Sequence, residues 1–106
     1  MSDWEEVAKI GEIEPGTCKA VEVDGNQVAL FNLDGEYYAI EDVCTHDGSE
    51  ISCGIVLGEE IMCSRHGARF CIKTGKVTAP PAYEDIETFP VRIENNSIQL
   101  RDERWD

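Results

Sequence analysis

The placing of the chain's two histidines constrains the fold more than any other feature of the sequence. Each lies next to a cysteine, in the strings Cys44-x-His46 and Cys63-x-x-His66, and sixteen residues separate the two pairs. Two thiolates and two imidazoles make a complete set of four ligands for one metal centre. If all four bind one centre, the fold must hold two separate loops side by side.

The rest of the chain predicts β-structure. Between turn signals lie short runs in which apolar and polar residues alternate, as at residues 20–23 and 97–101, and this period of two buries one face of a strand. The same alternation over residues 89–94 predicts another strand with one buried face. No segment shows a helical stripe, so we predict an all-β fold, a small sandwich or barrel, in a single domain over residues 1–106. The turn signals are Pro15-Gly16, Asp24-Gly25-Asn26, Asp34-Gly35 and Asn95-Asn96.

Both ligand pairs are expected in loops of this β scaffold. Cys44 follows a predicted strand that ends near Glu41, and Asp34-Gly35 joins that strand to the previous one as a hairpin. Cys63 follows the short apolar run Ile61-Met62 and precedes a strand predicted around residues 70–72. Loops on a rigid scaffold are a common place for a metal site.

Composition limits the kinds of binding partner and the cellular location that we expect for this chain. The chain of 106 residues has 9 Lys and Arg against 22 Asp and Glu, a net charge of −13. That charge argues against nucleic acid or a membrane surface as partner and suits a partner with a basic docking patch. The N-terminal string is acidic, so we expect no signal peptide and a cytoplasmic location. An odd number of cysteines, five, without a secretory context favours metal binding over disulfides.

Three interpretations of the Cys/His pairs remain open on spacing alone. The cysteines could be small buried side chains with incidental histidines. They could bind a structural zinc ion, although zinc motifs more often keep like ligands together. They could hold a [2Fe–2S] cluster in which two histidines replace two cysteines on one iron.

The pattern resembles the Rieske motif, Cys-x-His-x₁₆-Cys-x-x-His. With the longer strings CTHDG, CSRHGARF and TGKVTAPPAYEDIETFPVRIE, nearly the whole chain resembles the Rieske-type ferredoxins of bacterial ring-hydroxylating oxygenase systems. The resemblance implies a β-sandwich base with a small cluster-binding subdomain. It implies one [2Fe–2S] cluster, with Cys44 and Cys63 on one iron and His46 and His66 on the other. It also implies that the segment 79–81 shields the cluster.

The chain departs from the respiratory Rieske proteins at four positions. Their two loop cysteines, which form a disulfide, are replaced by Ser49 and Arg65, so that disulfide cannot form. Their serine and tyrosine, which hydrogen-bond cluster sulfur, are replaced by Ala68 and Phe70. Fewer donors to sulfur lower the reduction potential. The remaining cysteines match neither disulfide position, and we expect them to be small side chains without a metal-binding role; they are Cys18, Cys53 and Cys71.

The resemblance implies an electron carrier rather than an enzyme. A Rieske oxygenase needs a second iron site with two further histidines, and both histidines are already used. The expected partners are a flavoprotein NAD(P)H-dependent reductase and a terminal non-haem iron oxygenase. Two alternatives stay open: a small Rieske subunit of a nitrite-reductase-like complex, and a zinc-binding structural or adaptor module.

Overall fold

The computed structural model describes residues 4–45, 48, 50–64 and 67–102, apart from the side chain of Cys53. Within these ranges eleven strands and one short 3₁₀ turn, η1, confirm the predicted all-β class. No helix in the described part is long and apolar enough to cross a membrane. The elements are β1 Glu5–Lys9, β2 Thr17–Val23, β3 Asn26–Leu33, β4 Glu36–Glu41, η1 Ile51–Cys53, β5 Ile55–Leu57, β6 Glu60–Met62, β7 Arg69–Cys71, β8 Val77–Ala79, β9 Thr88–Phe89, β10 Val91–Glu94 and β11 Ser97–Leu100.

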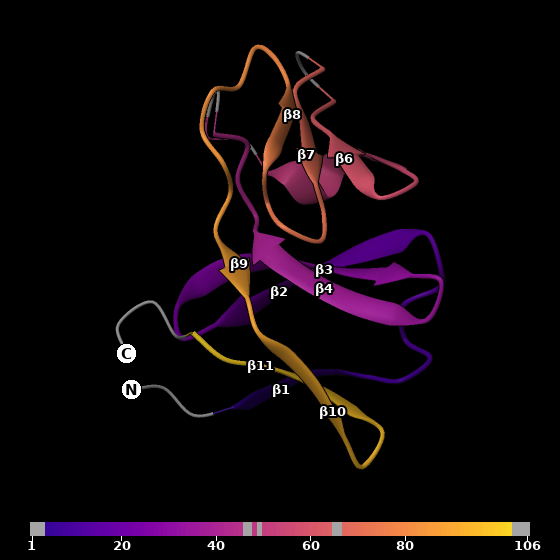
Figure 1. The fold of residues 1–106 in the computed structure, drawn as a ribbon. Helices are drawn as coiled ribbons and strands as arrows, with labels where there is room; N and C mark the ends of the chain where they lie inside the picture. The colour runs from indigo at the N-terminus through magenta and orange to yellow at the C-terminus, as the bar shows by residue number, and fades with distance from the viewer. Residues whose placement is uncertain (1–3, 46–47, 49, 65–66, 103–106) are drawn as a thin grey trace.

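The strands form three antiparallel sheets that stack on one another (Figure 1). The outer sheet has the order β1-β11-β10, the central sheet β2-β3-β4-β9, and the third sheet β5-β6-β7-β8. The chain passes directly from β9 in the central sheet to β10 in the outer sheet. The alternating run at residues 89–94 therefore divides between two sheets instead of forming one strand.

Strand β3 of the central sheet is buried on both faces. Along β3, Val28 and Leu30 belong to a core shared with the outer sheet, whereas Ala29 and Phe31 belong to a core shared with the third sheet. Successive side chains of a strand point to opposite faces, so one strand can supply both cores. This double burial explains why five consecutive residues of β3, positions 28–32, are buried.

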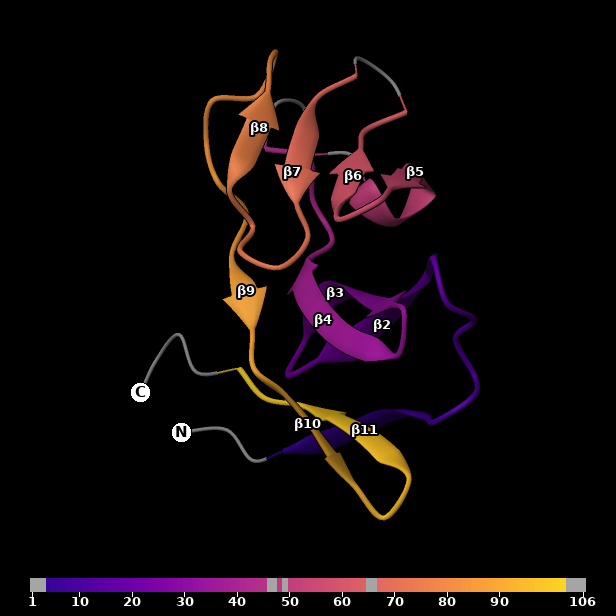
Figure 2. The ribbon, with the colours of Figure 1, turned by 45° about the vertical axis from the view of Figure 1, so that its right-hand side comes forward.

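The third sheet belongs to a unit inserted between β4 and β9, which we call the inserted unit (residues 42–87); the other strands form the base (Figure 2). Phe31 and Ile40 of the base pack in the same buried cluster as Ile61, Phe70 and Ile72 of the inserted unit. A sandwich base with a small second unit was predicted, and the structure confirms it. The shared core seats the inserted unit firmly on the base.

The predicted hairpins are present, but one side chain that was predicted to be buried is exposed. Leu33 pairs with Glu36 across a turn in which Asp34 and Gly35 have φ of 56° and 93°, the left-handed values that a two-residue hairpin turn needs. Ile93, in contrast, is 46% exposed, although the alternation predicted a buried face. It lies on the edge strand β10 of the outer sheet, one residue pair from the turn, where no other layer covers it.

Candidate metal centre

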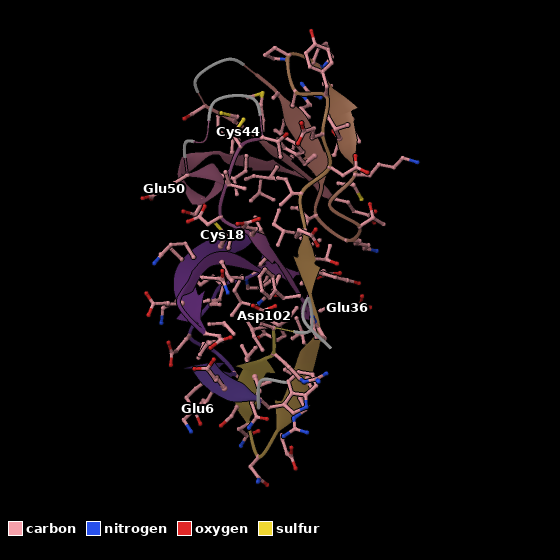
Figure 3. All side chains as sticks on the ribbon, turned by 90° about the vertical axis from the view of Figure 1, so that its left-hand side faces the viewer. Glu6, Cys18, Glu36, Cys44, Glu50 and Asp102 are labelled. Carbon is pink, nitrogen blue, oxygen red and sulfur yellow. The ribbon has the colours of Figure 1, made fainter. Side chains whose placement is uncertain are left out.

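The first cysteine of the predicted ligand set begins a loop directly after β4. Cys44 is fully buried, and its carbonyl accepts a hydrogen bond from the amide of Gly48 at 2.7 Å. The chain before it is held to the base, because the amide of Asp42 donates to the carbonyl of Gln27 at 2.9 Å. Figure 3 shows Cys44 in the inserted unit, well away from the outer sheet. The first loop therefore starts from a fixed point.

The second cysteine is equally well anchored. Cys63 follows β6, is only 2% exposed, and donates its amide to the carbonyl of Ala68 at 2.7 Å. Its carbonyl accepts from the amide of Gly67 at 3.1 Å. These two hydrogen bonds fix Cys63 at the point where the connection from β6 to β7 begins.

The two loops repeat one local construction. In each, a cysteine carbonyl accepts from the amide of the glycine four residues later, and Gly48 and Gly67 have φ of 78° and 79°. A side chain at either glycine would be strained in this left-handed conformation. The positive φ is the physical reason why a glycine suits each of these two positions.

The two cysteines also share one buried cluster. Cys44 and Cys63 both belong to the core between the central and third sheets. Two buried thiols presented by equivalent loops fit a metal centre with thiolate ligands. His46 and His66 lie outside the described residues, and within the described part no three metal-binding side chains come together. The four-ligand set therefore stays a prediction, with its cysteine half placed together in one core.

A buried carboxylate closes the first loop, and sequence reasoning missed it. Asp42 is 6% exposed, and its Oδ1 and Oδ2 accept from the amide and hydroxyl of Ser52 at 2.7 and 2.8 Å. We call these two hydrogen bonds the Asp42–Ser52 bracket. The segment between its ends, residues 42–52, contains Cys44 and His46. Nothing in the local sequence pairs an aspartate with a serine ten residues later, so only the fold reveals this contact.

The loop that contains residues 79–81, the segment predicted to shield a cluster, contacts the first ligand loop through Glu84. The hydroxyl of Thr45 donates to the carbonyl of Glu84 at 2.7 Å. Ala82 and Ile86, on either side of Glu84, are buried in the same core as the two cysteines. The loop between β8 and β9, which contains a cis Pro80–Pro81 bond, is thus fixed beside Cys44. Shielding of a cluster by this loop stays a prediction.

The two positions without hydrogen-bond donors lie in that core as well. Ala68 and Phe70 are fully buried in the cluster that contains Cys44 and Cys63. Their side chains cannot donate to sulfur. They surround the cysteines with an apolar environment, which disfavours added negative charge on a metal centre.

Of the other cysteines, two are described. Cys18 is half-buried at the junction between the base and the inserted unit, and its thiol donates to the carbonyl of Ser52 at 3.4 Å (Figure 3). Cys71 is half-buried on β7, and a hydrogen bond from the Thr74 hydroxyl holds the pKa of its thiol below the ordinary value. Cys53 is the third, and its side chain lies outside the description. Their expected lack of a metal-binding role stays a prediction.

A family model and relatives of known function match most of the chain. The family model described as the Rieske [2Fe-2S] domain matches residues 3–90. The chain is 39% identical over 99 residues to the ferredoxin component of the naphthalene 1,2-dioxygenase/salicylate 5-hydroxylase systems of Ralstonia sp., covering 93% of this chain and 95% of that one. It is 41% identical over 90 residues to the biphenyl dioxygenase ferredoxin subunit of Pseudomonas sp. (strain KKS102), covering 84% and 83%.

Solved structures share the whole fold. A structure titled as a complex of reduced oxygenase and oxidised ferredoxin in carbazole 1,9a-dioxygenase matches with a TM-score of 0.88 and 28% identity, over 92% of each chain. A second structure, from Mycobacterium tuberculosis, is titled as the small subunit of an NADH-dependent nitrite reductase. It matches with a TM-score of 0.85 and 26% identity, over 96% of each chain. The fold alone therefore does not separate these two kinds of protein.

Proposed function

Because the chain belongs to the Rieske [2Fe-2S] domain family, we propose that it carries single electrons from a reductase to a terminal oxygenase. It is an electron-transfer component and not itself a catalyst. The observation that carries the proposal is the pair Cys44 and Cys63, buried in one core at the start of equivalent loops. Relatives 39% and 41% identical are named as ferredoxins of dioxygenase systems.

The four predicted ligands would hold the cluster. Cys44 and Cys63 would bind one iron, and His46 and His66 the other, as the family motif implies. When bound, a [2Fe–2S] cluster takes up and releases one electron at a time.

The protein's own residues would hold this site rigid and dry. The Asp42–Ser52 hydrogen bonds and the Cys63–Ala68 hydrogen bond would hold the two loops in place around the cluster. Phe70 keeps water away from the buried side of the cysteines, because it is fully buried in the same cluster. When the residues around a site stay in place, little free energy is needed to reorganise them as the charge of the site changes.

The proposed partners are a flavoprotein NAD(P)H-dependent reductase and a terminal non-haem iron oxygenase, with the cytoplasm as the location. The net charge of −13 supports steering toward basic surfaces on such partners. Residues 1–106 would act as a single domain, which the core shared by the base and the inserted unit supports.

The two alternatives differ in their support. A role as the small subunit of a nitrite-reductase-like complex rests on a fold match at 26% identity, below the 39% and 41% of the ferredoxin relatives. A zinc module has less support, because the matching family is described by a [2Fe-2S] cluster.

Metal analysis and a coupled assay together test the proposal. The purified chain should contain two irons and two acid-labile sulfides, and Cys63→Ser should lose the native cluster. With NADH, a flavoprotein reductase and the terminal oxygenase of the naphthalene or biphenyl system, it should support substrate hydroxylation. Stoichiometric zinc in native protein would overturn the cluster assignment. A cluster-loaded chain that reduces neither oxygenase would overturn the oxygenase role.

A further inference from the structure

One aromatic side chain stands out on the surface of the inserted unit. Tyr83 is 87% exposed, whereas the other large apolar side chains identified as exposed, such as Ile55 and Ile93, expose 50% or less. A tyrosine ring left in water loses the burial that normally stabilises it. Exposed aromatic side chains on ordered loops are characteristic anchors of protein interfaces.

Tyr83 lies next to the proposed cluster site. Its neighbour Glu84 accepts a hydrogen bond from Thr45, and Thr45 lies between Cys44 and His46, two of the proposed ligands. A partner that grips Tyr83 is therefore brought to the first ligand loop. Close approach at that point is what electron transfer out of the protein requires.

The loop presents Tyr83 rigidly. Ala82 and Ile86 are 5% and 3% exposed, so the chain is anchored in the core on both sides of the tyrosine. The amide of Ile86 donates to the carbonyl of Gly75 at 2.7 Å, and Asp85 Oδ1 accepts from the amide of Val77 at 2.9 Å. Because the loop is already ordered, docking through it costs little conformational entropy.

The surroundings of Tyr83 are acidic. Segments 42–64 and 77–91, which contain the first ligand loop and the tyrosine loop, have no lysine or arginine. Glu84 and Asp85 beside the tyrosine are exposed. Of the described cations, Arg69 on β7 is paired with Glu60 at 3.7 Å, and exposed Lys76 directly precedes Val77, whose amide donates to Asp85. The matching surface on a partner would be an apolar pocket with a basic rim.

We propose that Tyr83 is the aromatic anchor through which this chain docks on its terminal oxygenase. The proposal rests on the electron-carrier function given above. The oxygenase is chosen over the reductase because a similar ferredoxin has been solved in complex with an oxygenase. The ring enters the apolar pocket of the oxygenase, and the flanking carboxylates meet its basic rim.

Three variants of the cluster-loaded protein test this docking role. Tyr83→Ser removes the ring, Tyr83→Phe keeps it, and Ile93→Ser removes an exposed apolar side chain from β10, on the outer sheet at the far end of the base (Figure 1). The probes are the terminal oxygenases of the naphthalene and biphenyl systems. The readouts are the KM for the ferredoxin in oxygenase turnover, the same constant for reduction by the reductase, the midpoint potential and the visible spectrum.

Tyr83→Ser should raise the KM for the oxygenase roughly tenfold, as the loss of an interface anchor does. Tyr83→Phe and Ile93→Ser should stay within about twofold of the wild type. The reductase constant, midpoint potential and spectrum should be unchanged in all three. An unchanged oxygenase KM in Tyr83→Ser, while the wild type works, would overturn the docking role alone. An equal rise in the reductase constant would overturn the choice of the oxygenase. A wild type that reduces neither oxygenase would overturn both this inference and the proposed function.

Discussion

Replacing Asp42 with alanine tests the bracket that closes the first ligand loop. The carboxylate is nearly buried and accepts two short hydrogen bonds from Ser52, at 2.7 and 2.8 Å. Hydrogen bonds to a charged group each contribute about 1.5–3 kcal/mol. Ser52 is only half-buried, so water can satisfy part of what it loses. The expected loss of stability is therefore about 2–3 kcal/mol, below the sum for two full bonds.

Thermal unfolding of the cluster-loaded protein measures this loss. For a domain of this size each kcal/mol shifts Tm by about 4–8 °C, so Asp42→Ala should lower Tm by roughly 10–20 °C. Ser52→Ala removes one of the two bonds and should lower Tm by about 5–10 °C. Because the bracketed segment carries two predicted ligands, an iron chelator should bleach Asp42→Ala several times faster than the wild type.

Glu14→Ala is the matched control, since it removes an exposed carboxylate from the base and should change neither Tm nor the bleaching rate. If Asp42→Ala unfolds within about 2 °C of the wild type, less than half a kcal/mol on the same conversion, the bracket does not stabilise the loop. A lower Tm with an unchanged bleaching rate would separate fold stability from retention of the cluster. That result would contradict the link between the bracket and the metal site.

Three further predictions concern the potential, a thiol and the response to acid. The midpoint reduction potential of the wild type should lie near about −150 mV. Phe70→Tyr should raise this potential by roughly tens of millivolts when the new hydroxyl donates to a cluster sulfur. Protein-film voltammetry measures both potentials, and a wild-type value well above zero would contradict the prediction. Cys71, whose thiol pKa is lowered by the Thr74 hydroxyl, should react with iodoacetamide at neutral pH faster than an ordinary surface thiol, as peptide mapping would show. The Ser97 hydroxyl lowers the pKa of Glu6 below its ordinary 4.5, so this carboxylate stabilises the fold above that pH and ceases to do so as the pH falls through its lower folded value. Glu6→Gln should accordingly lose less stability than the wild type between neutral and acidic pH, and an identical acid profile would refute it.

Local features of the fold could be predicted from the sequence because they depend on neighbouring residues. The hairpin at Asp34-Gly35 needs left-handed backbone at two adjacent positions, and aspartate and glycine accept it readily. The alternation at residues 97–101 correctly predicts a buried face, because Ile98 and Leu100 are fully buried. The ligand spacing predicted two loops that lie side by side, and Cys44 and Cys63 do begin two turns in one core. The placement of His46 and His66 beside them stays a prediction.

Contacts between distant segments were decided only in the tertiary structure. Asp42 and Ser52, or Thr45 and Glu84, meet because distant segments of the inserted unit fold against one another, and no local pattern encodes such a pairing. The exposure of Ile93 has the same origin, because its alternation matches a buried strand and only the edge position of β10 leaves it in water. Sequence periodicity reports which face of a strand is apolar. Whether another layer covers that face depends on how the whole chain packs.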